Sequence, residues 1–259
     1  MFWAGIDIGS TAAKAVLLDE AKAEVLERHL MPSGWNARET ADELLAWLLS
    51  LGRAREELHI TATGYGRVSV PYADAALTEI TCHGKGAAFL AAREGLPPDL
   101  TAIDIGGQDT KIIILEGGRV MDFVMNDKCS AGTGKFLEVM ADRLGVTLPG
   151  LFAMAEKGRA ITISSMCTVF AESEIVSLMG QGMPREDIAR GAVGSVVARV
   201  TALAGRKHPS GAWYLTGGFC EVPMMLRALS EALGAEVRSC LDARFAGAIG
   251  AALLGMARA

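Results

Sequence analysis

The sequence predicts an α/β protein built from two similar halves, and a repeated segment is the main reason. IDIGSTAAK at residues 6–14 returns as IDIGGQDTK at residues 103–111, with I-D-I-G and the final K unchanged. Each copy has an apolar run, a short polar turn and a second apolar run, which is the pattern of a β-hairpin. A strand, a Gly-Gly turn and a helix are expected later, over residues 213–233. These observations predict two sheets, each opened by a hairpin.

Length and composition agree with a large folded core. The chain has 259 residues, of which 51% are hydrophobic, enough for one or two domains. Pro97 and Pro98 end a predicted helix just before the second repeat, so we place a first half at 1–98 and a second half at 99–259. The closing segment 242–259 is rich in small residues, and we expect it to form a helix that packs back on the first half.

Charge and hydropathy argue against two kinds of partner, nucleic acids and membranes. A formal net charge of -5 argues against a nucleic-acid surface, which needs clustered Lys and Arg. No run approaches the roughly 18 apolar residues of a membrane span. The N-terminal MFWAGIDIG enters a strand pattern directly, without the basic region and cleavage site of a signal peptide. We therefore expect a cytoplasmic protein that binds neither nucleic acid nor membranes.

The remaining elements follow from local patterns, taken in chain order. Each half is expected to open with a three-stranded meander, over 3–10, 12–19 and 23–31 and again over 100–107, 110–118 and 118–126. Apolar and charged residues alternate at helical spacing over 39–58, which predicts a helix on the first meander. HITATG at 59–64 reads as a strand, a Gly-Tyr-Gly-Arg turn follows, and the segment up to residue 94 ends in a helix.

The tips of the two hairpins carry the chemistry of a phosphate site. Glycines let backbone N–H groups approach an anion closely, and hydroxyl and amide side chains add further donors. These tip residues are Gly9, Ser10 and Thr11 in the first hairpin and Gly106, Gly107, Gln108 and Thr110 in the second. Asp7 and Asp104 end the preceding strands, where a carboxylate can hold water around Mg²⁺. A single I-D-I-G can equally be a strand followed by a turn; its repetition favours the phosphate site, although no P-loop motif is present.

The late motif WYLTGG completes a resemblance at the level of fold. Gly217 and Gly218 form a turn on which a flat base or ribose can lie. The two hairpins and this motif resemble the sugar kinase, Hsp70 and actin superfamily, whose members have two ribonuclease-H-like halves with ATP between them. The resemblance implies that fold, and with it a nucleotide cleft between the halves. It does not choose among kinases, chaperones and other ATPases.

Two of the five cysteines have unusual neighbours. Cys129 and Cys167 each stand just ahead of a helical pattern, where Ser130, Thr133 or Thr168 can cap the helix. Amides at a helix N-terminus favour the thiolate, the form that ligates iron. Two ligands are too few for a cubane, but a second copy of the chain could supply the other two, so the ligand count predicts a homodimer with a bridging cluster. Buried inert cysteines and a catalytic thiol stay open as alternatives, whereas zinc would need C-x-x-C pairs.

The segments NDKCSAGTGKFLE (126–138) and SSMCTVFAESE (164–174) together closely resemble the activator ATPases of 2-hydroxyacyl-CoA dehydratases. The same family includes the ATP-binding subunits of benzoyl-CoA reductase. The resemblance implies a homodimer with one [4Fe-4S] cluster held by Cys129 and Cys167 of each chain. It also implies that ATP hydrolysis drives an electron to an iron–sulfur dehydratase or reductase, with a ferredoxin or flavodoxin as donor. The other cysteines, Cys82, Cys220 and Cys240, are expected to be packing residues.

Roles at the predicted nucleotide site can be assigned in outline. Asp7 and Asp104 are the expected holders of Mg²⁺-bound water, Gln108 is the candidate for orienting the attacking water, and Lys14 should reach the transferred phosphate. The turn after Cys129 is expected to contact the nucleotide through Gly132, Thr133, Gly134, Lys135 and Glu138. Ordinary turn and strand roles explain Asp109 and Lys111 nearly as well as catalytic ones.

Less prominent positions keep two interpretations. Glu79 and His83 can contact a partner or close the cleft, but a satisfied core histidine is the simpler interpretation of His83. Glu172 and Glu174 can be nucleotide contacts or a solvated helix face. We expect the two cysteine-led helices to act as a lever, with their other ends at the nucleotide cleft. Two alternative functions are a small-molecule kinase of the same superfamily and a nucleotide-sensing binding module.

Overall fold

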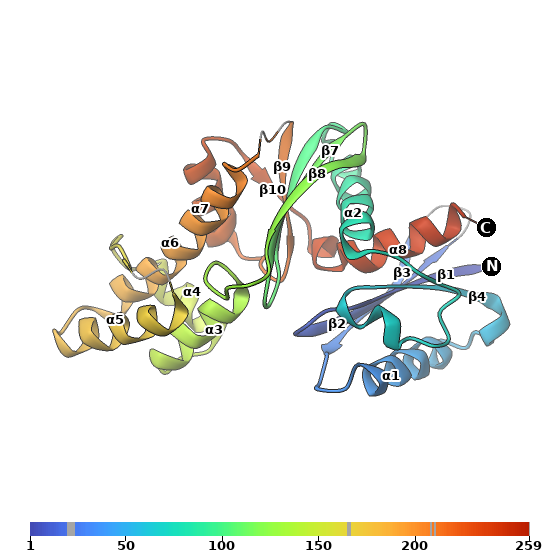
Figure 1. Ribbon diagram of the computed structural model, residues 1–259, viewed down its shortest axis with the longest axis horizontal. Helices are drawn as coiled ribbons and strands as arrows, with labels where there is room; N and C mark the ends of the chain where they lie inside the picture. The colour runs from blue at the N-terminus through green and yellow to red at the C-terminus, as the bar shows by residue number, and fades with distance from the viewer. Residues whose placement is uncertain (20–23, 165–166, 208, 210, 259) are drawn as a thin grey trace.

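The computed structural model describes residues 1–19, 24–164, 167–207, 209 and 211–258, and it contains two five-stranded sheets (Figure 1). The first sheet consists of β1 (Phe2–Ile8), β2 (Ala12–Asp19), β3 (Val25–Pro32), β4 (Leu58–Thr63) and β5 (Ala75–Ala76). The second consists of β6 (Leu100–Ile105), β7 (Thr110–Glu116), β8 (Arg119–Asn126), β9 (Ala212–Gly217) and β10 (Val237–Arg238).

Eight α-helices and three short 3₁₀ helices are found within the described residues. The α-helices are α1 (Ala37–Ser50), α2 (Glu79–Arg93), α3 (Gly134–Arg143), α4 (Leu148–Ala155), α5 (Thr168–Gly180), α6 (Arg185–Ala204), α7 (Pro223–Leu233) and α8 (Ala246–Met256). The 3₁₀ helices are Arg55–Glu57, Tyr65–Ser69 and Leu241–Phe245. None of the helices in the described part of the chain is both long enough and apolar enough to cross a membrane.

The two sheets have the same topology, which confirms the predicted duplication. Their strand orders are β3-β2-β1-β4-β5 and β8-β7-β6-β9-β10. In each, a hairpin pairs the first two strands antiparallel, and the fourth strand runs parallel to the first. The repeats fall on equivalent positions, because Asp7 lies opposite Lys14 in one hairpin and Asp104 lies opposite Lys111 in the other. This is the predicted α/β class with ribonuclease-H-like halves.

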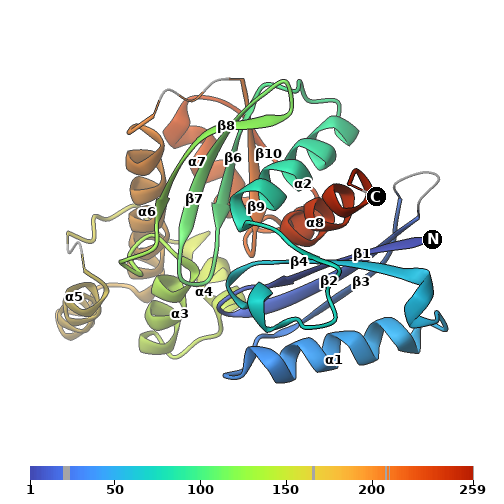
Figure 2. The ribbon, with the colours of Figure 1, turned by 45° about the vertical axis from the view of Figure 1, so that its right-hand side comes forward.

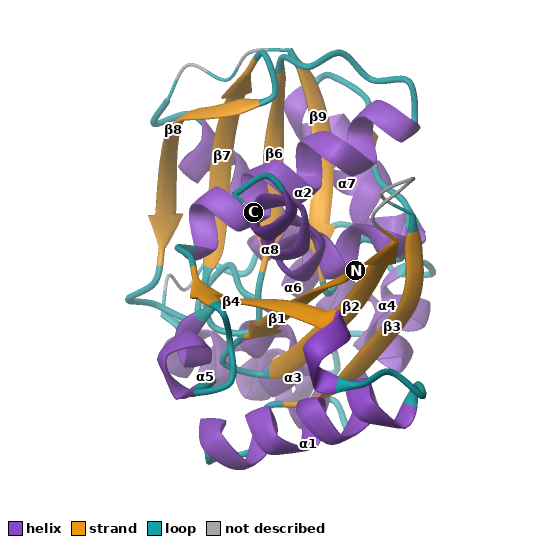
Figure 3. Ribbon diagram, turned by 90° about the vertical axis from the view of Figure 1, so that its right-hand side faces the viewer, coloured by secondary structure: helices purple, strands orange, loops and turns teal. Residues whose placement is uncertain are grey.

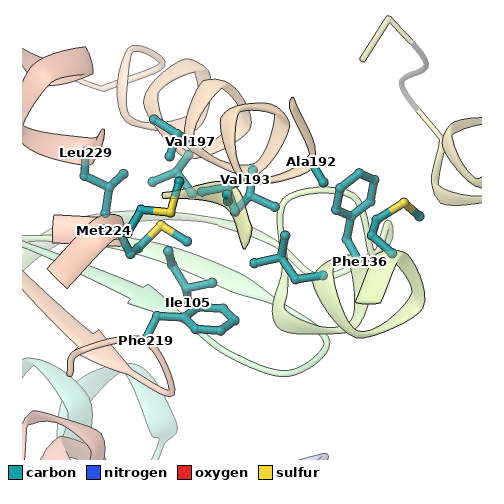
Figure 4. Close-up of a cluster of buried hydrophobic side chains, with 14 of the residues drawn as sticks. Ile105, Phe136, Ala192, Val193, Val197, Phe219, Met224 and Leu229 are labelled. Atoms are coloured by element: carbon teal, nitrogen blue, oxygen red, sulfur yellow. The ribbon is translucent and has the colours of Figure 1, made fainter. Parts of the chain in front are cut away.

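The strands that carry the repeats are buried on both faces. All of β6 and nearly all of β1 is buried, as expected for central strands that read as continuous apolar runs. On the outer face of the second sheet, Ile105 of β6 packs in one cluster with Phe136 of α3, Val193 of α6 and Met224 of α7 (Figure 4). This packing fixes the strand end at which Asp104 lies.

Helices α2 and α8 lie between the two sheets (Figures 2 and 3). Their crossing is so close that a Cβ added to Gly86 of α2 would lie 1.8 Å from the Ala246 carbonyl oxygen. A Cβ on Gly250 of α8 would lie 1.7 Å from the Cys82 carbonyl oxygen. Helix α2 contacts β6 to β9 of the second sheet, whereas α8 contacts β1, β2 and β4 of the first. Helix α2, from the first half of the chain, therefore packs on the second sheet, and α8, from the second half, packs on the first sheet.

Several boundaries differ from the sequence-based expectation. The helix predicted over 39–58 ends at Ser50, because Leu51 leaves the helical conformation and Gly52 takes a φ of +75°. The closing helix begins at Ala246, after a 3₁₀ turn, and the last residue of its predicted range, 259, lies outside the described residues. The third strand begins at Val25; residue 23, its expected start, is also outside them.

Candidate nucleotide cleft and cysteine-led helices

A cleft of about 270 Å³ opens where the tips of the two hairpins meet. Most residues predicted for the nucleotide line it: Asp7, Gly9, Ser10, Thr11, Lys14, Asp104, Gly106, Gly107, Gly134, Glu138, Gly217 and Gly218. Leu148 of α4 and Phe219 add an apolar part to the lining next to the Gly-Gly turn. The lining thus combines carboxylates, ammonium groups and close backbone with an apolar surface, as a nucleotide requires.

The first hairpin tip is held by Ser33, at the end of the meander. The Gly9 amide donates to the Ala12 carbonyl at 3.2 Å and closes the turn. The Ser33 amide donates to the Thr11 carbonyl at 3.1 Å, and its hydroxyl donates to the Gly9 carbonyl at 2.6 Å. With these carbonyls occupied, the open side of the tip presents N–H and hydroxyl donors to the cleft.

The second hairpin tip touches the first. The Gly106 amide donates to the Asp109 carbonyl at 2.9 Å, and a Cβ on Gly106 would lie 2.3 Å from Asp109 Oδ1. A Cβ on Gly107 would lie 2.0 Å from Thr11 Oγ1, so the absence of a side chain at Gly107 lets the two tips meet. The glycines at this tip are therefore required by packing, in addition to any contact with phosphate.

Helix α3 begins on the second hairpin tip. The Gly134 amide donates to the Gly106 carbonyl at 2.9 Å, and the Lys135 amide donates to the Gly107 carbonyl at 2.8 Å. These are first-turn amides, which have no partner within their own helix. The predicted cap by the Thr133 side chain is wrong, because its hydroxyl donates backwards to the Ser130 carbonyl at 2.6 Å. The hairpin itself replaces the cap.

Lys111 is the centre of a buried charge network. Its side chain is 1% exposed, and Nζ lies 2.7 Å from Asp109, 2.9 Å from Glu79 and 3.2 Å from Asp104. Burial alone would lower the pKa of Lys111, but the three carboxylates raise it above its ordinary value. Lys111 and Asp109, which turn and strand roles explained nearly as well as catalytic ones, are thus part of the cleft lining.

Besides Lys111, Asp104 faces the His83 imidazole of α2. His83 Nε2 lies 3.5 Å from Asp104 Oδ1 and 2.7 Å from the Thr216 hydroxyl. Burial would raise the pKa of Asp104, but His83, Lys111 and Lys14 together lower it to about 2. His83 is buried and hydrogen-bonded, in line with the simpler of its two interpretations, and it also forms one wall of the cleft.

Asp7 has a buried oxygen available for a ligand. Its carboxylate lies 4.0 Å from Lys14 Nζ, and Oδ1 is buried without a hydrogen-bond partner. Gly64 and Gly247 press against it, since a Cβ on either would lie 2.4 or 2.5 Å from an Asp7 oxygen. Asp7 and Asp104 are hard oxygen donors beside a phosphate-sized space, which fits a Mg²⁺ ion that keeps most of its water.

The structure reveals an internal repeat that the sequence analysis did not identify. Thr63-Gly64 ends β4 and Thr216-Gly217 ends β9, and both glycines have positive φ, +84° and +83°. Thr63 pairs with Asp7 in register as Thr216 pairs with Asp104. The shared Thr-Gly letters were visible in ITATG and YLTGG, but the residues after them diverge.

Other expected site residues lie outside the cleft lining. They are Gln108, Gly132, Thr133, Lys135, Cys129 and Cys167. Gln108 is exposed at the hairpin tip, whereas its neighbour Asp109 is buried. Gly132 has a φ of +88°, and its carbonyl accepts a hydrogen bond from the Thr110 hydroxyl at 2.7 Å, so it braces the loop before α3. Lys135 is exposed, and its ammonium group lies 3.2 Å from Glu138, which does line the cleft.

Cys129 and Cys167 lie at the surface, on adjacent segments. Cys129 is exposed in the loop before α3, where Asn126 Nδ2 donates to its carbonyl at 2.8 Å. Cys167 is half-buried at the N-cap of α5, and the Ser130 and Thr168 hydroxyls hydrogen-bond at 2.8 Å, joining the two segments. Within the described residues no group of three or more His, Cys, Asp or Glu side chains is placed to hold a metal.

The other three cysteines are placed differently. Cys82 and Cys220 are buried, and burial raises the pKa of each thiol to about 11, in line with the expected packing roles. Cys240 is half-buried rather than fully packed, and its sulfur accepts a hydrogen bond from the Tyr214 hydroxyl at 3.2 Å. Cys82 lies in α2, Cys220 in the turn between β9 and α7, and Cys240 directly before the 3₁₀ helix Leu241–Phe245.

Helix α5 projects from the end of the second half (Figure 1). It exposes large apolar side chains, and Val169 and Phe170 are 65% and 68% exposed. The expected lever needs correction, because α5 contributes no residue to the cleft lining and α3 reaches it with its first turn, next to Cys129. Glu172 forms an ion pair with Arg143 of α3, Glu174 accepts hydrogen bonds from Ser164, and neither lines the cleft.

The cleft and the cysteine-led helices agree with the outcome of comparisons with known proteins. The sequence profile of one ATPase family matches residues 4–255. The chain belongs to the BadF/BadG/BcrA/BcrD ATPase family. Membership in this family confirms the resemblance noted in the sequence.

Individual relatives and solved structures show which members of the family this BadF/BadG/BcrA/BcrD ATPase resembles. The (R)-2-hydroxyglutaryl-CoA dehydratase activating ATPase of Acidaminococcus fermentans is 40% identical over 258 residues, covering 98% of this chain and 97% of the relative. The crystal structure of that dehydratase's component A superposes with a TM-score of 0.92 at 39% identity, over 100% of this chain and 98% of the other. The activator of 2-hydroxyisocaproyl-CoA dehydratase from Clostridium difficile, solved with bound ADPNP, has a TM-score of 0.90 at 36% identity, over 100% and 95%.

Proposed function

We propose that this chain couples ATP hydrolysis to delivery of a low-potential electron, from a [4Fe-4S] cluster bridging two copies of the chain, to a partner enzyme. The link between the second hairpin tip and the cysteine loop carries this proposal. Gly134 and Lys135 donate to carbonyls of the tip, and Cys129 lies in the loop that leads into the same helix turn. A change in the position of the tip therefore reaches a thiol within one short element.

The residues of the cleft have distinct roles in this proposal. The backbone amides of both tips and the Ser10 and Thr11 hydroxyls bind the phosphates, and Lys14 offers positive charge to the transferred group. The Thr110 hydroxyl, expected to be a further donor at the second tip, donates to the Gly132 carbonyl instead. Asp7 and Asp104 would hold Mg²⁺ through its water, and the ion would neutralise charge on the phosphates. Gly217, Gly218 and the apolar lining accept the adenosine. The relative solved with bound ADPNP supports a nucleotide in this cleft.

The thiols fit an iron–sulfur cluster only when two chains contribute. Each chain offers Cys129 and Cys167 at its surface, and a cubane takes four thiolates. A twofold axis beside these cysteines would bring four together and would also cover the apolar side of α5. When bound, the cluster supplies a one-electron carrier. Asn126 and the Ser130–Thr168 hydrogen bond hold the two ligand segments in place.

Closure of the two halves, 1–98 and 99–259, is the motion that we propose for coupling. The tips meet at Thr11 and Gly107, so loss of a phosphate between them changes how closely they approach. Helices α2 and α8 cross between the sheets and give the halves a common pivot. The chain's own contribution is to transmit this approach through α3 to the cysteine loop.

Partners follow from the relatives' names. These name activators of 2-hydroxyglutaryl-CoA, 2-hydroxyisocaproyl-CoA and lactoyl-CoA dehydratases and a benzoyl-CoA reductase subunit. We propose an iron–sulfur dehydratase or reductase as electron acceptor, with ferredoxin or flavodoxin as donor, in anaerobic metabolism.

Single-turnover electron transfer tests the proposal. The dithionite-reduced dimer is mixed anaerobically with such a dehydratase, with and without Mg-ATP, while its absorbance and the released phosphate are followed. We expect reoxidation that requires Mg-ATP, with one inorganic phosphate released per ATP. Phosphate transfer to a sugar without reoxidation would favour the kinase alternative. Nucleotide binding with neither reaction would favour the binding module.

A further inference from the structure

Glu79 lines the nucleotide cleft, which the residues around it in the sequence do not indicate. It is the first residue of α2 and lines the cleft beside the second hairpin tip. Its Oε1 lies 2.9 Å from Lys111 Nζ, and its side chain is 22% exposed while that of Lys111 is 1% exposed. One carboxylate oxygen is thus fixed by a buried cation.

The Glu79 side chain is partly exposed where it lines the cleft, so its second carboxylate oxygen can serve a ligand there. The structure records Lys111 as the polar partner of this carboxylate among the described residues. Gln108, the residue first expected to orient the attacking water, is exposed and outside the cleft lining. The charged groups that act on the Glu79 carboxylate are Lys111, which is bound to it, and the carboxylates of Asp7 and Asp104, which share its charge.

Lys111 fixes the position of Glu79 relative to the phosphate-binding tip. The same ammonium group binds Asp109 of the tip at 2.7 Å and Asp104 of the preceding strand at 3.2 Å. Glu79 therefore keeps one position relative to both, although it comes from a helix of the other half of the chain. Burial raises the pKa of Glu79, with Lys111 opposing, which makes this carboxylate a better proton acceptor than an exposed one.

We propose that Glu79 orients the water that attacks the terminal phosphoryl group of ATP and accepts its proton. The inference rests on the ATPase function proposed above. The water oxygen forms a bond to the γ-phosphorus, and the bond from that phosphorus to the bridging β–γ oxygen breaks. One proton of the water passes to the Glu79 carboxylate, and the products are ADP and inorganic phosphate. Release of phosphate then returns the proton to solvent.

The test compares the change in kcat with the change in nucleotide affinity. In Glu79→Gln the side chain keeps its size and can still contact the cleft, but it cannot accept a proton. On the anaerobically purified dimer we expect kcat for phosphate release to fall about 10²–10³-fold. The Kd for ADPNP should stay within about threefold. Glu116→Gln, the same change at the exposed far end of β7, is the matched control and should keep both values.

Glu79→Asp tests the same point if the Gln variant does not fold. It keeps the charge beside Lys111 but withdraws the carboxylate by one methylene, so we expect an intermediate loss of kcat, about tenfold, with ADPNP still bound. A kcat within threefold of wild type in either folded variant would overturn the inference. So would a loss of kcat matched by an equal loss of ADPNP affinity, which is the signature of a purely structural ion pair. A wild-type protein that binds ADPNP and releases no phosphate would overturn the proposed ATPase as well.

Discussion

The Thr11 side chain lies directly against Gly107, so that the tips of the two phosphate hairpins are in contact. A Cβ on Gly107 would lie 2.0 Å from Thr11 Oγ1 and 2.7 Å from Thr11 Cβ. These two residues come from opposite halves of the chain. Their contact therefore depends on how closely the two halves approach each other at the nucleotide cleft.

Gly107→Ala should hold the hairpin tips apart. Because displacement of reacting groups by about 1 Å can cost about 10²-fold in rate, we expect a loss of that order in kcat for ATP hydrolysis. Phosphate release gives kcat, and small-angle X-ray scattering with ADPNP reports the closure. Gly194→Ala, on an exposed face of α6 with open space around the added methyl, is the control. A Gly107→Ala variant with normal kcat would show that this contact does not govern closure.

Cys129→Ala separates the two functions of the chain. Removing the thiol should reduce iron from about four per dimer to near zero, because the remaining thiols cannot ligate a cubane. Binding of ADPNP should persist, since Cys129 is outside the cleft lining. Iron analysis and calorimetric titration measure the two effects. Cys240→Ala is the control for a half-buried cysteine elsewhere and should retain iron. Simultaneous loss of ADPNP binding from a folded Cys129→Ala protein would contradict this separation.

Phe170→Asp should prevent dimerisation. Phe170 and Val176 of α5 are 68% and 53% exposed in the single chain, and a charge on this surface would be costly to bury between two copies. We expect the dimer Kd to rise at least about 10²-fold and the bound iron to be lost with it. Sedimentation velocity measures the association. Leu241→Asp, 73% exposed on a 3₁₀ turn, should remain dimeric. An iron-loaded Phe170→Asp dimer would place the interface elsewhere.

The lowered pKa of Asp104 predicts acid sensitivity. Its pKa is about 2 in the folded chain against an ordinary value of 3.8, so the fold favours the carboxylate form. This stabilisation is present above pH about 4 and is lost as the pH falls toward 2. In the nucleotide-free protein, the free energy of unfolding should fall over that window, and it should fall less in Asp104→Asn. Denaturant unfolding at a series of pH values gives both curves. Parallel curves would mean that Asp104 has no such linkage.

The repeat predicted both hairpins correctly because its residues determine the local structure directly. I-D-I-G followed by polar residues specifies a strand and a turn wherever it occurs, and so both hairpins formed as expected. Helix ends were less certain. Helix α1 ends at Ser50, although the apolar pattern continues, because Gly52 follows closely. Helix α8 begins only at Ala246, because a 3₁₀ turn precedes it.

The composition of the cleft was harder to predict because it depends on packing between distant segments. Nothing in the residues around Glu79 indicates that α2 leaves its own sheet and packs on the other one. The orientation of the hairpin tip also decides between neighbours. Asp109 faces Lys111 and Gln108 is exposed, in a turn that the bond from the Gly106 amide to the Asp109 carbonyl closes.

The most direct test of the central claim is an anaerobic iron count. The reconstituted protein is purified, iron and sulfide are measured per dimer, and spectra are recorded with and without Mg-ATP. The account predicts about four irons per dimer, lost on replacing Cys129 or Cys167, and a cluster signal that responds to the nucleotide. A colourless, iron-free protein that still binds ATP after careful reconstitution would contradict it.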